Sequence, residues 1–184
     1  MRKSLVMLGV AAGLVVGGAA PASAEERTCR GTLGRVTVDN VRVPPGATCN
    51  LGGTKVQGTV KVERNATLYM LWANVVGNVQ AENAAAVNVV GSSIGGSIQV
   101  KQGRAATVLS STVKADIQYD ANRAAVRADR NKVGGNIQAF ENTGGVAFNA
   151  NRVDGNLQCK ENVPRPTGGR NIVQGNKEDQ CARL

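Results

Sequence analysis

The stretch GNIQAFENTGGVAFNANRVDGNLQCKEN, from Gly135 to Asn162, contains one short phrase twice: Gly-Asn-Ile-Gln returns twenty residues later as Gly-Asn-Leu-Gln. The phrase belongs to a series of units that hold Gly or Ala, a small polar residue, an aliphatic residue and, in all but the first unit, Gln. The units begin every 19 or 20 residues, at Gly58, Gly77, Gly96, Ala115, Gly135 and Gly155. A constant step of this length indicates a repeat architecture.

Apolar residues keep the same step and form columns along the series. One column comprises Val60, Val79, Ile98, Ile117, Ile137 and Leu157. The next comprises Val62, Ala81, Val100, Tyr119, Ala139 and Cys159. Within each unit apolar and other residues alternate, which is typical of strands. A unit of 19–20 residues has room for three short strands and three tight turns, but not for a helix as well. The sequence therefore predicts an all-β chain, folded as a single right-handed parallel β-helix (solenoid) of about seven coils with a 19–20-residue repeat.

Two other architectures fit the pattern less well. A leucine-rich repeat would carry a denser Leu/Asn pattern and usually a helical side. A β-sandwich would not keep one period across several columns. The right-handed sense comes from the general rule for parallel crossovers and not from any residue.

Two kinds of residue are expected at the corners of the coils. Glycine adopts positive φ without strain and suits sharp turns. Stacked Asn or Ser side chains can bond along a column and satisfy the turn amides. The glycine pairs are Gly52-Gly53, Gly95-Gly96, Gly134-Gly135, Gly144-Gly145 and Gly168-Gly169. The polar corner column is Ala73, Ser92, Ser111, Asn131, Asn151 and Asn171.

The chain divides into four expected segments. Residues 1–24 have a basic start, an apolar stretch and a small-x-small end, the pattern of a secretory signal peptide. The apolar run of about 16 residues is short for a membrane span, which wants roughly 20, so no stable membrane anchor is expected. Residues 25–58 are expected to form an N-terminal cap and a first irregular coil, residues 59–175 the β-helix coils, and residues 176–184 a C-terminal cap. We therefore expect a secreted, extracellular protein.

Four cysteines in an exported chain indicate two disulfides. The two ends of the stack should lie roughly 30 Å apart along the axis, at about 4.8 Å per coil. A disulfide needs its Cα atoms within about 7 Å, which leaves one pair at each end. The predicted bridges are Cys29–Cys49 and Cys159–Cys181.

The charge balance points to an anionic partner or to plain solubility. The formal net charge of +9 becomes +7 once Arg2 and Lys3 are removed with the signal peptide. A secreted basic protein is drawn to anionic cell-wall polymer or acidic polysaccharide, although scattered charges also serve solubility alone. Basic residues with interleaved aromatics do not occur, so no nucleic acid is expected as a partner. We expect no cofactor, and no metal site, because the chain has no histidine and no Cys-x-x-Cys.

Two pairs of carboxylates are the candidates for acid/base chemistry. Glu63 and Glu82 should be vertical neighbours with Lys101 next in the column, and Asp116 and Asp120 should share an outward face. A close pair of this kind acts in glycoside hydrolysis. We favour a solvated charge column relieved by lysines, and a non-enzymatic protein, over a minimal lyase-like polysaccharide enzyme.

Two surface features remain as candidate sites. A glutamine ladder can bind sugar hydroxyls or simply stack on itself: Gln80, Gln99, Gln118, Gln138 and Gln158. An apolar stripe is a candidate interface for self-association, unless a terminal segment covers it or the strand phase slips by one residue: Tyr69, Leu71, Val90 and Leu109.

The chain resembles small secreted actinomycete-type parallel β-helix proteins of uncharacterised function. The resemblance rests on the Gly-Asn-(Ile/Leu/Val)-Gln units across residues 58–160 and on the closing stretches Asn156-Leu-Gln-Cys-Lys-Glu-Asn and Gly175-Asn-Lys-Glu-Asp-Gln-Cys. It implies the architecture and the C-terminal cap, and it carries no catalytic role to any residue. The expected function is that of a structural, adhesive or binding module at or outside the cell surface, with carbohydrate binding by the ladder as an alternative.

Overall fold

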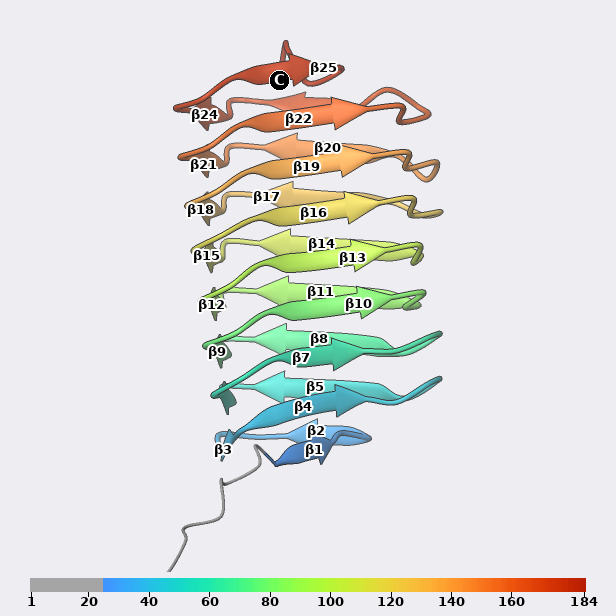
Figure 1. Cartoon of the computed structure of the whole chain (residues 1–184), viewed down its shortest axis with the longest axis vertical. Coiled ribbons are helices and arrows are strands. Elements are labelled where there is room, and N and C mark those ends of the chain that lie inside the picture. The colour runs from blue at the N-terminus through green and yellow to red at the C-terminus, as the bar shows by residue number, and fades with distance from the viewer. Residues whose placement is uncertain (1–24) are drawn as a thin grey trace, which may run out of the picture.

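The computed structural model describes residues 25–184, which form a stack of coils with three β-strands in each. The expected signal peptide, residues 1–24, lies outside the described residues. Every strand pairs in parallel with strands of the neighbouring coils (Figure 1). As the chain climbs, the front strands run to the right and the rear strands to the left, so the helix is right-handed. The predicted parallel β-helix is confirmed.

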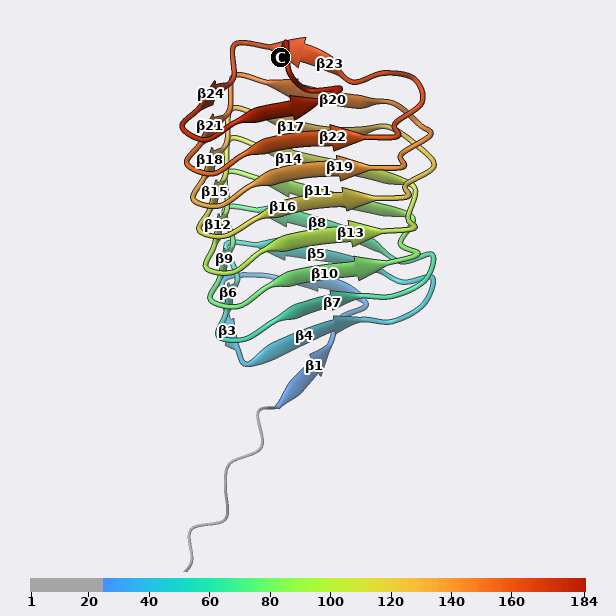
Figure 2. The ribbon, with the colours of Figure 1, turned by 45° about the horizontal axis from the view of Figure 1, so that its top comes forward.

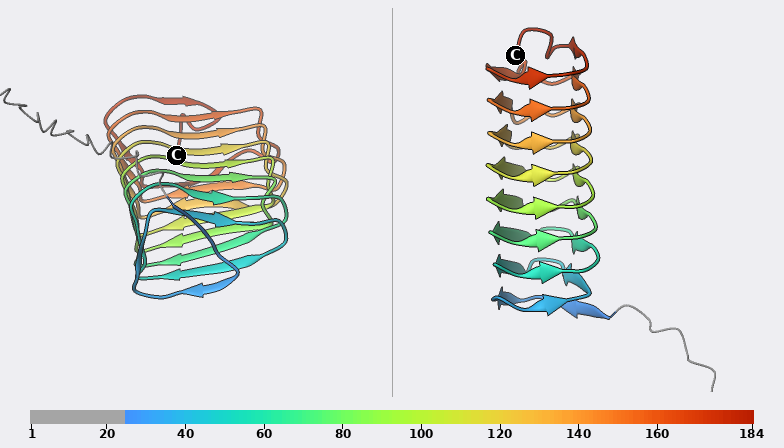
Figure 3. Two further views of the ribbon diagram at one scale, coloured as in Figure 1. Left: turned by 60° about the horizontal axis from the view of Figure 1, so that its bottom comes forward. Right: turned by 90° about the vertical axis from the view of Figure 1, so that its left-hand side faces the viewer.

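The strands form three sheets that enclose one narrow interior, as the oblique and side views show (Figure 3). Sheet A comprises β1 (Glu26–Thr28), β4 (Asn40–Val43), β7 (Val60–Val62), β10 (Val79–Glu82), β13 (Ile98–Lys101), β16 (Ile117–Asp120), β19 (Ile137–Phe140), β22 (Leu157–Lys160) and β25 (Lys177–Asp179). Sheet B comprises β2 (Gly31–Leu33), β5 (Thr48–Gly52), β8 (Thr67–Leu71), β11 (Ala86–Val90), β14 (Ala105–Leu109), β17 (Val126–Asp129), β20 (Val146–Asn149) and β23 (Thr167–Gly169). Sheet C comprises β3 (Thr37–Val38), β6 (Lys55–Val56), β9 (Asn74–Val75), β12 (Ser93–Ile94), β15 (Thr112–Val113), β18 (Lys132–Val133), β21 (Arg152–Val153) and β24 (Ile172–Val173).

The stack holds about eight coils, where the repeat predicted about seven. The additional coil comes from the N-terminal segment: β1 to β6 already make two coils before the first Gly-Thr-Val-Lys unit at Gly58. These early coils lack the Gln of the later units, so the sequence pattern does not reveal them.

The core consists of the predicted apolar columns. In sheet A, Val79 lies opposite Ile98, Ile98 opposite Ile117, and each of these side chains is fully buried. Alternate residues point out, so the burial pattern of β10 reads buried, exposed, buried, exposed. Because a single coil cannot enclose its own apolar side chains, the stacking of coils provides the stabilisation.

The two largest buried side chains lie in neighbouring sheets and pack on each other. The rings of Tyr119 and Phe148 stack with their centroids 6.2 Å apart. Tyr119 lies between Val100 and Ala139 in its column, and Phe148 follows Ala128, so bulk alternates from coil to coil. The Tyr119 hydroxyl donates to the Arg127 carbonyl at 2.9 Å. Burial, with a smaller contribution from Asp129, raises the pKa of Tyr119, so the phenol stays neutral and able to donate.

Each of the three corners carries a ladder of polar side chains. Their oxygen atoms accept hydrogen bonds from backbone N–H groups of the neighbouring coil. At the corner between sheets B and C, Ser111 N donates to Asn131 Oδ1 at 2.9 Å and Asn131 N donates to Asn151 Oδ1 at 3.0 Å, as predicted. A second ladder, between sheets A and B, was not predicted; it comprises Asn122, Asn142 and Asn162. The third lies between sheets C and A and comprises Asn40, Thr59, Asn78, Ser97, Asp116, Asn136, Asn156 and Asn176.

The expected role of the glycine pairs is partly wrong. Gly53 has the positive φ that a sharp turn requires, but Gly95 and Gly134 do not. These glycines are needed because the coils approach closely: a Cβ at Gly95 would collide with the Val76 carbonyl of the coil below. Most positive φ values at the corners belong to other residues, among them Asn83, Trp72 and Arg130.

Both predicted disulfides are present, one at each end of the stack. Cys29 and Cys49 have their Cα atoms 5.6 Å apart, and Cys159 and Cys181 have theirs 5.2 Å apart. The second bridge holds the final turn of the chain, which folds back over the last coil (Figure 2). Leu184 packs there against the core. Residues 25–184 include no helix long and apolar enough to cross a bilayer.

Candidate functional site

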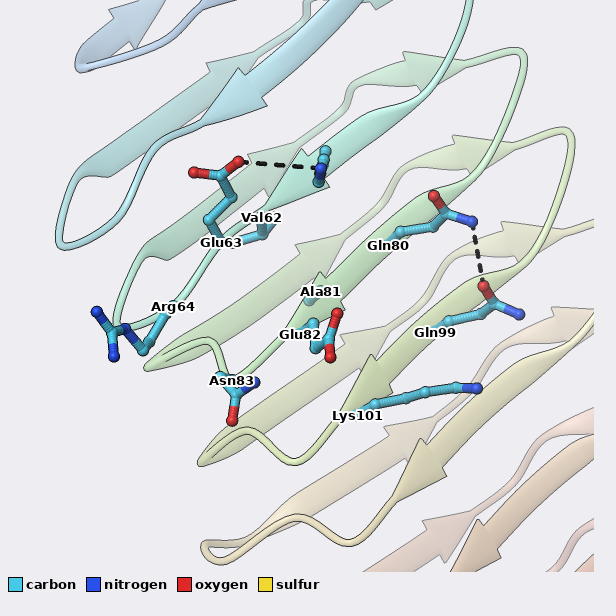
Figure 4. A pocket seen from close by; sticks show the side chains of 10 residues that line it. Val62, Glu63, Arg64, Gln80, Ala81, Glu82, Asn83, Gln99 and Lys101 are labelled. Atoms are coloured by element: carbon cyan, nitrogen blue, oxygen red, sulfur yellow. Dashed lines mark hydrogen bonds and ion pairs between the residues drawn. The ribbon is translucent and has the colours of Figure 1, made fainter.

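A shallow groove of about 570 Å³ lies on the outer face of sheet A, across β7, β10 and β13. Val62 and Ala81 also line it, although their side chains point into the core, so the strand backbone rather than a side chain lies between the flanking polar groups. The groove is mostly polar at its rim, where long side chains stand on both sides of Ala81 (Figure 4). The rim includes Lys61, Glu63, Arg64, Gln80, Glu82, Gln99 and Lys101.

The carboxylate of Glu63 is held by an arginine from the preceding coil. Arg42 donates through Nε to Oε1 at 2.8 Å and through its terminal nitrogen to Oε2 at 2.9 Å. Lys61 Nζ lies 4.0 Å from the same carboxylate. The Arg42 hydrogen bonds lower the pKa of Glu63, and the Glu63 carboxylate raises the pKa of Arg42. Glu63 is therefore an ion-pair partner, poorly suited to protonate a substrate.

Glu82 has no ion-pair partner among the described residues. It lies opposite Lys101 in the pairing of β10 with β13, which gives the vertical order that the sequence predicted. Because Glu63 is engaged by Arg42, the two carboxylates do not form a matched acid and base. The expected charge column is real, but an arginine outside the column neutralises part of it.

The second carboxylate pair, Asp116 and Asp120, is divided between a corner ladder and a strand end. Asp116 precedes β16 and belongs to a corner ladder, where its Oδ1 accepts from Asn136 N at 2.7 Å and from Asn136 Nδ2 at 3.2 Å. Asp120 ends β16, opposite Lys101 on one side and Phe140 on the other. Asp116, Gln118 and Asp120 alternate with the buried Ile117 and Tyr119, so the two carboxylates lie on the outward side as expected. Asp116, however, is already engaged by Asn136.

The predicted glutamine ladder is continuous and hydrogen-bonded along its whole length. Each side-chain amide donates to the carbonyl oxygen of the next Gln, at distances from 2.7 to 3.3 Å. The last member, Gln158, donates to Glu178 at 2.7 Å. Each inner amide therefore uses one of its two N–H groups and one of its two acceptor sites within the ladder. The remaining donor and acceptor capacity faces outward.

The predicted apolar stripe lies on the outer face of sheet B. Leu71 lies opposite Val90, and Val90 lies opposite Leu109. Tyr69 and Leu71 are about half exposed, at 47% and 49%, and Trp72 is 70% exposed. The column changes character at the next coil, where the register places Asp129 opposite Leu109.

Asp129 is a buried carboxylate that sequence reasoning missed. Its side chain is 1% exposed and accepts hydrogen bonds from Arg127 Nε and, at 3.0 Å, from Asn149 Nδ2. These contacts account for its burial as a charged group. Leu109, Asp129 and Asn149 follow one another at the 20-residue step. The repeat therefore places Asp129 in this column, but it does not show that the carboxylate is buried.

Within residues 25–184 no group of three or more Cys, Asp or Glu side chains is arranged to hold a metal ion. Comparison of the chain with protein-family models, with curated proteins and with solved structures gives no match.

Proposed function

We propose that the chain is a secreted, non-enzymatic β-helix module that binds polysaccharide through the groove on sheet A. One observation carries the proposal: Gln80 and Gln99 of the ladder line the same concave surface as Lys61 and Lys101. The amides offer unused donors and acceptors to sugar hydroxyls, and the lysines offer further donors. The groove runs across neighbouring strands, so equivalent groups repeat at the coil spacing along an extended ligand.

The rigidity of the groove supports a binding role. The ladder bonds fix the Gln80 and Gln99 amides relative to each other at 3.3 Å, and the ion pair with Arg42 fixes Glu63. Side chains that are already ordered lose little entropy when a ligand binds.

The contacts of the acidic residues support a non-enzymatic role. Glu63 is engaged by Arg42 and Asp116 by Asn136, so neither carboxylate is left unengaged for acid/base work. Secretion is supported by the two disulfides, which persist in oxidising compartments.

Calorimetric titration with neutral and acidic polysaccharides tests this proposal. Gln80→Ala/Lys101→Ala should weaken binding at least about tenfold, or about 1.4 kcal/mol, because it removes an amide and a cation from the groove. Gln174→Ala/Lys132→Ala removes the same chemical groups from the side of sheet C and should bind as wild type does. Flat titrations of the wild type, or equal losses from both double variants, contradict the proposal.

A second proposed role is self-association through the apolar stripe. The observation that favours it is the exposure of Tyr69 and Leu71 on β8 and of Trp72 directly after that strand. Contiguous exposed apolar surface commonly marks a protein interface. In this role two copies would pair through sheet B and leave the groove on sheet A accessible.

A further inference from the structure

A second hollow, of about 430 Å³, lies at the corner where sheet A turns into sheet B. Three arginines line it, namely Arg64, Arg104 and Arg123, together with the amides of Asn83 and Gln102. No carboxylate lines this hollow. The arrangement differs from the groove on sheet A, where cations and carboxylates alternate.

Two of these arginines occupy equivalent positions in consecutive coils. Arg104 N donates to the Ala84 carbonyl, and Arg123 N donates to the Gly103 carbonyl. The backbone therefore places the two residues one coil apart, at about 4.8 Å. Like charges at this spacing repel each other and destabilise the fold unless a counter-charge is present.

The protein itself supplies no such counter-charge. Among residues 25–184, no ion pair involves Arg64, Arg104 or Arg123. Ion pairs in residues 25–184 involve Arg42, Lys61, Arg127 and Lys160, so most cations of the surface are unpaired; the corner hollow differs in gathering three of them. The three guanidinium groups thus form a positively charged surface that an external anion would neutralise.

The hollow is continuous with the groove. Arg64 and Asn83 line both of them, so an extended ligand lying across β7 and β10 can continue round the corner to Arg104 and Arg123. Figure 4 shows Arg64 and Asn83 at the edge of the groove, beyond the ends of the strands that carry the glutamines.

We propose that the corner hollow binds the carboxylates of a polyuronate, an acidic polysaccharide with one carboxylate on each sugar ring. This inference rests on the proposed polysaccharide binding and names the class of polysaccharide. A guanidinium group binds a carboxylate through two parallel hydrogen bonds. Arg104 and Arg123 stand one coil apart along the stack, so two guanidinium groups are available to carboxylates of one polymer chain.

The test compares polygalacturonate with its fully methyl-esterified form, which keeps the sugar backbone and removes the charge. Wild type should bind polygalacturonate at least tenfold more tightly at low salt, and added salt should reduce this preference. Arg104→Gln/Arg123→Gln should lose the preference and still bind the ester. Arg152→Gln/Arg170→Gln removes the same net charge from exposed positions elsewhere and should keep the preference. Circular dichroism verifies that each variant is folded.

Three outcomes overturn the inference. If Arg104→Gln/Arg123→Gln still prefers polygalacturonate, the two arginines do not bind its carboxylates. Binding of the ester would in that case still support the proposed function. If inorganic polyphosphate binds more tightly than polygalacturonate, the hollow is a phosphate site. If wild type binds neither form of the polymer nor any other polysaccharide, the proposed function and the inference both fail.

Discussion

The side-chain amide of Asn142 donates to Asn162 Oδ1 at 2.9 Å, and the same oxygen accepts from the Asn142 backbone N–H at 3.0 Å. The amide also donates to the Tyr119 carbonyl at 3.0 Å. Asn142 Oδ1 accepts in turn from the Asn122 backbone N–H at 3.0 Å. The buried side chain therefore satisfies a turn amide and a strand carbonyl of the preceding coil, and Asn162 of the next coil satisfies the Asn142 turn amide. The corner side chains therefore add hydrogen bonds between coils to those of the three sheets.

Replacement of Asn142 should be strongly destabilising. Asn142→Leu removes the acceptor of the Asn122 backbone N–H and of its side chain, and it leaves the Tyr119 carbonyl without that donor. Each unsatisfied buried group costs about 1–3 kcal/mol, so we expect a loss of at least about 2 kcal/mol in urea unfolding. Asn74→Leu, on the exposed face of β9, is the control and should change stability little. Equal losses from the two variants would show that the ladder does not stabilise the stack.

The coil contacts of glycine predict a second difference in stability. Gly95→Ala forces a Cβ against the Val76 carbonyl, and such overpacking costs about 1–3 kcal/mol. A Cβ at Gly52 meets nothing within 4 Å, so Gly52→Ala should be close to neutral. Thermal unfolding of both variants measures the difference. Similar melting temperatures would mean that coil spacing adjusts to admit the methyl group.

The ion pair between Arg42 and Glu63 predicts a pH dependence. The folded-state pKa of Glu63 lies below its ordinary value of 4.5. The pair therefore stabilises the protein fully above about pH 4.5, and this contribution disappears as the pH falls through the lowered folded-state pKa. Glu63→Gln should be less stable than wild type at pH 7, and the gap should close in acid. Urea unfolding from pH 7 to pH 2 measures it, with Glu82→Gln as the matched control. A gap that stays constant over this range would contradict the assignment.

The apolar stripe predicts self-association of the wild type. Light scattering should show a mass that rises with protein concentration. Leu71→Ser/Leu109→Ser should lower that mass to the monomer, because it removes apolar area from the middle of the stripe. Val76→Ser/Ile172→Ser replaces two exposed apolar side chains elsewhere and should associate as wild type does. A wild type that is monomeric at all concentrations would exclude the interface.

The core and the glutamine ladder were predictable because they repeat. A step of 19–20 residues fixes which side chains lie above one another, so Val79, Ile98 and Ile117 could be placed without a structure. The partner of Glu63 was not predictable in this way. Arg42 lies opposite Lys61 and reaches diagonally to Glu63, a contact that depends on side-chain length and not on the period.

The corners were harder to predict than the strands. The ladder of Asn122, Asn142 and Asn162 keeps the 20-residue step, but Ala84 and Gly103 occupy the corner in the preceding coils and hide it. The corner arginines show a similar limit. Arg104 and Arg123 keep the step, and so do Arg64, Asn83 and Gln102, but the step does not show that these two columns line one hollow.

The glutamine ladder gives the face of sheet A a direction. Every ladder amide donates toward the C-terminal end of the stack, from Gln80 to the carboxylate of Glu178. The amide dipoles therefore add, and the row begins beside the cation of Lys61 and ends on an anion. A polysaccharide is also directional, with a reducing and a non-reducing end. A chain lying on this face would meet two unlike ends of the row, and one of its two orientations would bind more tightly.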